Sequence, residues 1–140
     1  MQKTTEKKLI LLVDDNVFYH TTVGTILSDK YEVITAKSGR EAIEHLLKGI
    51  VPDLVLLDIV MPEMDGWVTY RRIRELSLEQ DIPIVFVTSM YGTSEVKHAY
   101  DMGAADFITK PYKREDLLNR IENIIQKKHA NEPQKTVVPQ

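Results

Sequence analysis

Short apolar runs alternate with segments of helical periodicity through most of the chain. The runs are rich in branched residues and nearly free of polar positions, a pattern typical of strands that are buried on both faces of a parallel sheet. In chain order the predicted strands are Leu9–Val13, Tyr31–Ala36, Asp53–Leu57, Ile82–Thr88 and a short fifth strand that ends at Lys110.

Apolar residues recur at helical spacing in the segments between and after these strands, which predicts amphipathic helices. The predicted helices run from Asn16 to Ser28, from Gly39 to Leu47, from Gly66 to about Leu76, from Thr93 to Met102 and from Arg114 to about Lys127. Polar residues suited to capping stand at the start of three of them: Asn16 or Asp15, Ser38 and Asp65. Gly49 is expected to end the second helix.

The helix that begins at Gly66 has an inner and an outer face in this interpretation. Large side chains at three-residue steps are expected to point inward: Trp67, Tyr70, Ile73 and Leu76. A run of arginines is expected to face solvent, without a function: Arg71, Arg72 and Arg74. We expect Trp67 to pack the helix against the sheet rather than to contact a ligand.

The repeated order of strand and helix, joined by short connections, predicts a parallel sheet with helices on both faces. Right-handed crossovers leave few arrangements, and a five-stranded sheet of order 2-1-3-4-5 fits best. The sequence therefore predicts a single α/β domain, a doubly wound (βα)5 fold, over residues 8–128. Residues 1–7 form a polar N-terminal lead, and residues 129–140, polar and without periodicity, are expected to form a flexible tail.

Composition and charge exclude several classes of partner. The 140 residues carry a net charge of −3, which provides no basic surface for nucleic acid or an anionic membrane. Cysteine is absent, which excludes disulfides and thiolate metal sites. The histidines lack metal-ligand spacing and are expected at the surface: His20, His45, His98 and His129. No apolar run reaches the length of a membrane span, and we expect a cytoplasmic protein.

Polar and charged side chains stand at the carboxyl ends of four predicted strands. Asp14 and Asp15 follow the first strand, Asp58 follows the third, Thr88 ends the fourth and Lys110 ends the fifth. In the predicted order the first and third strands meet at the topological switch point, so the three carboxylates should converge. Two unit charges about 4 Å apart interact by roughly 4 kcal/mol at an effective dielectric constant of about 20. We therefore expect Lys110, a retained proton or a hard cation such as Mg²⁺ to relieve their repulsion.

Taken singly, these residues have simpler interpretations. An aspartate at a strand end commonly begins a turn, which would explain Asp58. Thr88 fits an ordinary β-branched strand position, and Phe107 fits a plain core position on a short strand. The combination of complementary groups at four strand ends is what favours a site.

Four segments together resemble the receiver domain of two-component response regulators, over roughly residues 8 to 128. They are Leu-Val-Asp-Asp-Asn at 12–16, Leu-Leu-Asp-Ile-Val-Met-Pro-Glu-Met-Asp-Gly at 56–66, Val-Thr-Ser at 87–89 and Gly-Ala-Ala-Asp-Phe-Ile-Thr-Lys-Pro at 103–111. The resemblance implies a flavodoxin-like fold and a phosphoprotein of a phosphorelay, either chemotaxis-type or a stand-alone single-domain response regulator.

The resemblance also implies roles for the strand-end residues. Asp58 would be the phosphorylation site, taking a phosphoryl group from the phosphohistidine of a sensor histidine kinase or from a small acyl phosphate. Asp15 and Asp58 would ligate Mg²⁺ directly, Asp14 mainly through water, and the backbone carbonyl of Val60 would add a ligand. Thr88 and Lys110 would contact phosphoryl oxygens. Such transfer rests mainly on positioning and charge neutralisation, which suits this set.

A conformational switch is implied by the same resemblance. The Lys110-Pro111 peptide would be cis, and Phe107 would turn inward when Thr88 moves toward the phosphoryl group. Phosphorylation would then reshape the surface of the fourth helix, fifth strand and fifth helix for a downstream protein target. A homodimer through the fourth and fifth helices is a further expectation, with Asp106 and Arg120 as charged partners.

The phosphorylated state is expected to be long-lived. Val60, two residues beyond Asp58, and Met90, two beyond Thr88, are apolar and cannot position an attacking water by hydrogen bonding. Beyond its own Mg²⁺-dependent phosphorylation and dephosphorylation we expect no enzymatic activity. The polar segment after residue 128 offers no output domain, and we favour a stand-alone domain over an excised one because the chain begins with methionine.

Three other classes share parts of this pattern. A phosphoaspartate phosphatase usually has a second acid two residues after the nucleophile, whereas position 60 is valine. A flavodoxin-like flavin binder needs a Ser/Thr/Gly-rich loop after the first strand, whereas Asp14 and Asp15 would repel a phosphate. A phosphorylation-independent interaction module on the same fold usually lacks one site residue, and none is missing here.

Overall fold

The computed structural model describes residues 7–77, 80–90 and 92–130, which form one five-stranded parallel sheet of order β2-β1-β3-β4-β5. The strands are β1 (Lys8–Val13), β2 (Tyr31–Ala36), β3 (Leu54–Leu57), β4 (Ile84–Thr88) and β5 (Asp106–Thr109). The helices are α1 (Val17–Leu27), α2 (Gly39–Leu47), α3 (Gly66–Leu76), α4 (Thr93–Met102) and α5 (Arg114–Ala130). The doubly wound fold and its strand order are confirmed. The predicted flexible tail lies almost entirely outside the described residues.

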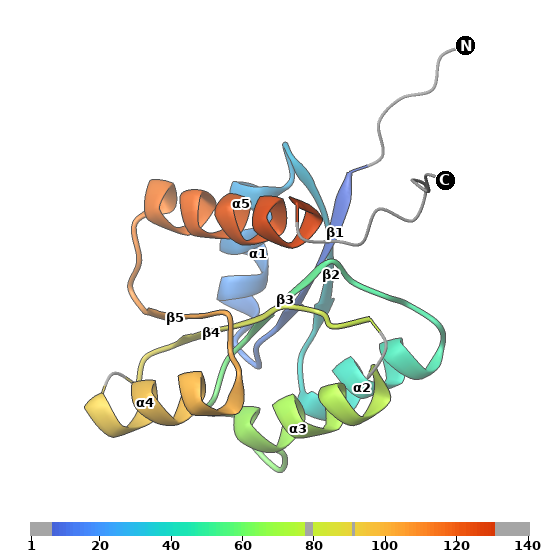
Figure 1. Cartoon of the computed structure of the whole chain (residues 1–140), viewed down its shortest axis with the longest axis vertical. Coiled ribbons are helices and arrows are strands. Elements are labelled where there is room, and N and C mark those ends of the chain that lie inside the picture. The colour runs from blue at the N-terminus through green and yellow to red at the C-terminus, as the bar shows by residue number, and fades with distance from the viewer. Residues whose placement is uncertain (1–6, 78–79, 91, 131–140) are drawn as a thin grey trace, which may run out of the picture.

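Helices cover both faces of the sheet, with α1 and α5 on one side and α2, α3 and α4 on the other (Figure 1). Successive residues of a strand point to opposite faces. Leu11 and Val13 of β1 therefore join the core beneath α2, α3 and α4, whereas Ile10 and Leu12 join the core beneath α1 and α5. Both cores exclude water from the central strands, which explains why β1 and β3 are almost wholly apolar.

Strand register brings the candidate residues to one edge of the sheet. Val13 of β1 pairs with Leu57 of β3, so the residues that follow, Asp14 and Asp58, leave the sheet at the same level. The Asp58 backbone N–H donates to the Val13 carbonyl at 3.0 Å. The predicted convergence thus follows from neighbouring strands that end together.

Side-chain caps begin three helices at the predicted positions. The Asn16 side chain accepts from the Phe18 N–H, the Ser38 hydroxyl from the Glu41 N–H and the Asp65 carboxylate from the Val68 N–H. Asn16, rather than Asp15, is the residue that caps α1, which leaves the Asp15 carboxylate available to the site. Gly49, just after α2, has a φ of 97°, a left-handed conformation that glycine adopts without strain.

The predicted faces of α3 are wrong at two positions. Leu76 is 44% exposed, because three-residue steps drift by about 60° each and turn it roughly half a circle away from Trp67. Arg74 does not face solvent: its guanidinium donates to the Ile82 carbonyl at 2.6 Å and to the Tyr70 hydroxyl. The position of Leu76 thus follows from helix geometry, whereas contacts with neighbouring elements decide the position of Arg74.

Replacing Arg74 with methionine is expected to lower the free energy of unfolding by about 1 to 2 kcal/mol, because a buried carbonyl loses a charged donor and the Tyr70 ring loses a stacked cation. Arg72→Met is the matched control, since Arg72 is exposed and its one ion pair among the described residues is with Glu75 at 3.7 Å. It should cost about 0.5 kcal/mol or less. Urea denaturation of both variants measures the difference. Equal losses would show that the Arg74 contacts contribute nothing beyond a surface pair.

The fifth helix is longer than the periodicity predicts, since α5 continues to Ala130 rather than ending near Lys127.

Among the described residues, no helix combines the length and apolar character that a membrane span requires. The α/β scaffold positions the site at the ends of β1 and β3.

Candidate functional site

Three carboxylates gather at the carboxyl ends of β1 and β3. Asp14, Asp15 and Asp58 each offer an oxygen within 4.8 Å of the oxygens of the other two. Asp14 and Asp58 are 2% and 7% exposed, whereas Asp15 lies at the surface. The cluster therefore has two buried acids and an open side that faces solvent.

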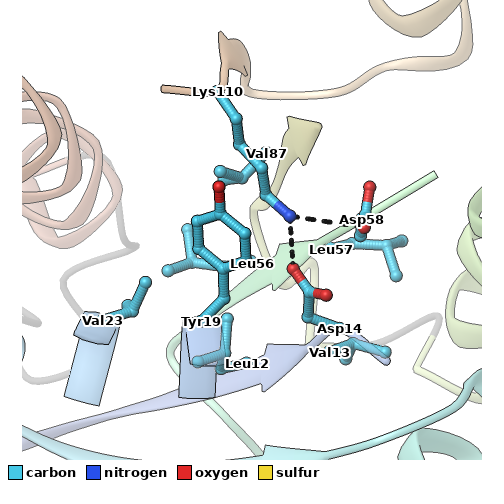
Figure 2. Close-up of a pocket in the computed structure, with 10 residues that line it drawn as sticks. All are labelled: Leu12, Val13, Asp14, Tyr19, Val23, Leu56, Leu57, Asp58, Val87 and Lys110. Atoms are coloured by element: carbon cyan, nitrogen blue, oxygen red, sulfur yellow. Dashed lines mark hydrogen bonds and ion pairs between the residues drawn. The ribbon is translucent and has the colours of Figure 1, made fainter. Parts of the chain in front are cut away.

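Lys110 supplies a positive charge from the neighbouring end of β5. Its Nζ donates to Asp14 Oδ2 at 2.6 Å and to Asp58 Oδ2 at 3.4 Å (Figure 2). The peptide bond between Lys110 and Pro111 is cis, as the resemblance implies. The lysine lies closer to Asp14 than to the predicted phosphoacceptor, a preference that the sequence does not indicate.

Thr88, the last residue of β4, is fully buried beside the carboxylates. Its hydroxyl oxygen accepts a hydrogen bond from the Met90 N–H at 3.3 Å, and the hydroxyl also interacts with the Asp58 carboxyl. The Lys110 N–H donates to the Thr88 carbonyl at 2.8 Å, which ties the ends of β4 and β5 together. The Thr88 hydroxyl is thus placed next to the Asp58 carboxyl, and its contact with a phosphoryl group stays a prediction.

Burial raises the pKa of the Asp58 carboxyl above its ordinary value. The Lys110 ammonium lowers this pKa, the Asp14 carboxylate raises it, and hydrogen bonds from the Thr88 hydroxyl and the Ile59 N–H lower it. The outcome is a net rise in the pKa of Asp58, because burial and the Asp14 charge together outweigh Lys110 and the hydrogen bonds. A bound cation would favour the ionised form of Asp58.

The loop after β3 turns tightly over Asp58. The Gly66 N–H donates to the Ile59 carbonyl at 2.7 Å, and a Cβ built on Gly66 would lie 2.3 Å from the Asp58 carbonyl oxygen. Only glycine allows this close approach. Val60 lies on this loop with its side chain exposed, beside the site, and its role as a carbonyl ligand remains a prediction.

The donor set fits a hard divalent cation. The side chains that converge are carboxylates, which Mg²⁺ prefers, and two of the three are held in place by the sheet. With three acids against one lysine, the cluster keeps a net negative charge when ionised. Asp14, Asp15 and Asp58 are the residues that would hold such an ion.

Phe107 lies in the core rather than at the surface. Its ring is 7% exposed and tilts against Phe86 at 6.3 Å between centroids. Phe86 also contacts Trp67 of α3 at 4.9 Å and stacks on Tyr70 at 5.6 Å. The contact with Phe86 bears out the expectation that Trp67 packs α3 onto the sheet. The ring of Phe107 already lies inward in this structure. The predicted inward turn on phosphorylation therefore stays a prediction.

Two residues of α1 contact the site and were not singled out from the sequence. The Tyr19 ring lies beneath Lys110, with Nζ 3.8 Å from the ring centroid, and His20 Nε2 lies 2.5 Å from the Asp14 carbonyl oxygen. The inner stripe of α1 could have indicated Tyr19, which precedes Val23 by four residues and Leu27 by eight. No pattern pointed to His20, which was expected at the surface and is half-buried.

The other histidines lie away from the carboxylates. His45 Nε2 contacts the Thr35 carbonyl at 3.1 Å and is half-buried rather than exposed, and the exposed His98 meets Trp67 edge-on at 4.5 Å. The side chain of His129 is outside the described part of the structure. Within the described ranges, the acidic cluster is the one group of three or more histidine, aspartate or glutamate side chains close enough to share an ion.

The strand order and the helices on both faces of the sheet match the fold of CheY-like receiver domains. Comparison with known families gives the same result from sequence, because the model for the response regulator receiver domain matches residues 10–122. The chain belongs to this family.

Similar proteins come from several bacterial lineages. A transcriptional regulatory protein, DltR, of Streptococcus agalactiae is 39% identical over 113 residues, covering 80% of this chain and 49% of its own length. The non-phosphorylated HemR receiver domain of Leptospira biflexa superposes with a TM-score of 0.76 at 37% identity, covering 85% of this chain and 94% of that one. The CheX–CheY–BeF3–Mg complex of Borrelia burgdorferi contains a chain with a TM-score of 0.77 at 30% identity, covering 85% of this chain and 90% of that one.

The chain spans about half the length of the first curated relatives it matches. The similarity therefore concerns the receiver domain, which those longer proteins share with this chain.

Proposed function

We propose that Asp58 is the phosphoacceptor of a two-component phosphorelay and that its phosphorylation controls binding of a partner protein. The observation that carries the proposal is the position of Asp58: a buried carboxylate at the switch point, with Lys110 at 3.4 Å and two further acids beside it. Family membership supports the same conclusion.

The residues of the chain suit a direct displacement at phosphorus. An ionised Asp58 oxygen forms the new P–O bond while the P–N bond of a phosphohistidine, or the P–O bond of an acyl phosphate, breaks and its electron pair leaves with the donor. Lys110 and the Thr88 hydroxyl would stabilise charge on the phosphoryl oxygens. Mg²⁺ held by Asp14, Asp15 and Asp58, with the Val60 carbonyl as a further ligand, would neutralise the remaining charge.

The reaction leaves the protein modified, so we propose no catalysis beyond its own phosphorylation and dephosphorylation. The donor would be a sensor histidine kinase or a phosphotransferase, and the product would be read by a downstream protein. One structural neighbour is the CheX–CheY complex of Borrelia burgdorferi, which supports protein binding as an output of this fold. The cytoplasmic location stays a prediction from the sequence.

Switching would involve α4, β5 and α5. Thr88 ends β4 and Phe107 lies on the adjacent β5, so a shift of the Thr88 hydroxyl toward a phosphoryl group would act on the packing of Phe107. Asp106 and Arg120, the charged residues expected at a dimer interface, pair with each other within one chain in this structure, at 3.0 Å. A dimer that uses these charges would have to open or share this ion pair.

The decisive experiment is intact mass spectrometry after incubation with acetyl phosphate, with and without Mg²⁺. We expect one phosphoryl adduct that forms only with Mg²⁺, and borohydride reduction followed by peptide mapping should locate it at position 58. A folded protein that forms no adduct with metal present would overturn the proposal and favour a phosphorylation-independent interaction module.

We expect the aspartyl phosphate to be long-lived, because Val60 and Met90 offer no hydrogen bond to an attacking water. Val60→Gln should shorten its half-life by roughly threefold to tenfold by positioning that water. Val51→Gln, at an exposed valine outside the site, is the matched control. Loss of the adduct is followed by mass after the donor is removed. A wild-type half-life of seconds would contradict the prediction.

A further inference from the structure

The Lys110 ammonium has three donor hydrogens but only two carboxylate partners among the described residues, Asp14 and Asp58. Its third side faces the Tyr19 ring, with Nζ 3.8 Å from the ring centroid (Figure 2). A cation at this distance from an aromatic face is attracted by the ring quadrupole, most strongly where water is excluded. The lysine side chain is 9% exposed, so this condition is met.

The surroundings of Lys110 offer little else on that side. The small cavity beside its ammonium is lined by Asp14, Tyr19, Asp58 and Lys110 and otherwise by apolar residues of β1, α1, β3 and β4 (Figure 2). The tyrosine ring thus takes the place that an oxygen acceptor would occupy in a polar site.

The Tyr19 ring belongs to a capped helix and packs against an aromatic neighbour. It lies on the first turns of α1, whose N-terminus is capped by Asn16, and Phe18 meets its ring edge-on at 5.5 Å. Tyr112, at the start of the β5–α5 connection, has a buried hydroxyl. Burial is the first cause that raises the pKa of Tyr112 to about 12, and the charge of the Tyr19 phenol is the second.

We propose that Tyr19 is a positioning residue for phosphoryl transfer: its ring holds the Lys110 ammonium between the Asp14 and Asp58 carboxylates. The inference rests on the proposed function of Asp58. A lysine has a flexible stem and no planar group to orient it, so its placement depends on what surrounds the ammonium. Without the ring, the ammonium is free to follow Asp14, its shorter contact, away from Asp58.

The test compares three kinds of side chain at position 19. Tyr19→Leu removes the ring and should slow phosphorylation by acetyl phosphate and Mg²⁺ by about fivefold. Tyr19→Phe keeps the ring and should restore a rate close to that of the wild type. Mono-, di- and trifluorinated phenylalanines keep the shape but withdraw electrons from the ring face, so the rate should fall with each fluorine. A packing role would leave the fluorinated series flat.

Phe18→Leu is the comparison variant: it removes the exposed ring that meets Tyr19 edge-on but leaves the Tyr19 ring beside Lys110, so it should slow phosphorylation less than Tyr19→Leu does. A second measurement does not depend on phosphorylation. In NMR spectra the Lys110 Hε signals should be shifted upfield by the ring current in the wild type and in Tyr19→Phe, and this shift should vanish in Tyr19→Leu.

The outcomes separate the two proposals. If the wild type forms no adduct, the proposed function fails, whatever the Lys110 signals show. If the wild type is phosphorylated but Tyr19→Leu and the fluorinated series react at its rate, the role of Tyr19 alone is overturned. If Tyr19→Leu does not fold, the fluorinated series still decides, because each member keeps the ring in place.

Discussion

Replacing Asp58 with asparagine is expected to abolish the phosphoryl adduct and to stabilise the metal-free protein. The first effect follows because the amide cannot act as the nucleophile. The second follows because burial and the neighbouring Asp14 carboxylate raise the pKa of Asp58, which means that the folded protein tolerates its charge poorly. Removing that charge should increase the free energy of unfolding by about 1 kcal/mol at neutral pH.

The pH dependence gives the sign of this effect. Since the pKa of Asp58 is higher in the folded protein than in the unfolded chain, the folded state binds the proton more tightly. The contribution of Asp58 to the free energy of unfolding is therefore most favourable below the ordinary aspartate pKa. This contribution is lost as the pH rises through the raised pKa of the folded protein. The Asp58→Asn variant should lack this loss, so its stability curve should lie above that of the wild type only at the higher pH.

Urea denaturation across pH, in buffer with a chelator, measures the effect. Asp15→Asn is the matched control, because it removes an exposed acid of the same cluster and should change stability less. Added Mg²⁺ should narrow the difference between wild type and Asp58→Asn, since the ion stabilises the ionised cluster. A variant that is less stable than the metal-free wild type at neutral pH would show that Lys110 already compensates the charge of Asp58.

Replacing Lys110 with methionine is expected to have the largest effect on stability, a loss of about 3 kcal/mol at neutral pH without metal. The substitution keeps most of the apolar stem but leaves Asp14 and Asp58 buried without their cation. Removing one partner of a buried ion pair is costly because the remaining charge has neither water nor a counter-ion.

Conditions that neutralise the carboxylates should reduce this loss. At acid pH Asp58 takes up its proton in the folded protein, and the deficit of Lys110→Met should shrink as the pH falls. Mg²⁺ should also bind Lys110→Met more tightly than the wild type, because the ion no longer competes with the ammonium for Asp14. Calorimetric titration of Mg²⁺ measures this affinity.

Lys113→Met is the control for Lys110→Met, since Lys113 is exposed on the same connection to α5. It should be close to neutral in both stability and Mg²⁺ affinity. Equal losses in the two lysine variants would show that the contacts of Lys110 with the two acids contribute no net stability.

The fold could be predicted from the sequence because its elements are specified locally. Apolar runs such as Leu54–Leu57 fit only strands covered on both faces, and Asn16, Ser38 and Asp65 mark helix starts by side-chain hydrogen bonds to residues two or three positions on. The predicted orientation of a side chain is wrong where contacts with a neighbouring element determine it. Arg74 turns inward because the Ile82 carbonyl and the Tyr70 ring lie within its reach.

The composition of the site followed from sequence as well. Strand order and the position of each polar residue at a strand end are enough to bring Asp14, Asp58 and Lys110 to one edge, because parallel strands expose their carboxyl ends together. The sequence by itself therefore determined that the carboxylates and the lysine meet, but not that Tyr19 joins them.

Only the tertiary structure decided how far apart these charged groups lie and which of them interact most strongly. Lys110 lies nearer to Asp14 than to Asp58, its third side rests on the Tyr19 ring, and the balance leaves the pKa of Asp58 raised. These features depend on distances of a few ångströms between side chains from β1, α1, β3 and β5. Electrostatic and cation–π interactions change steeply over such distances, and no local pattern in the chain encodes them.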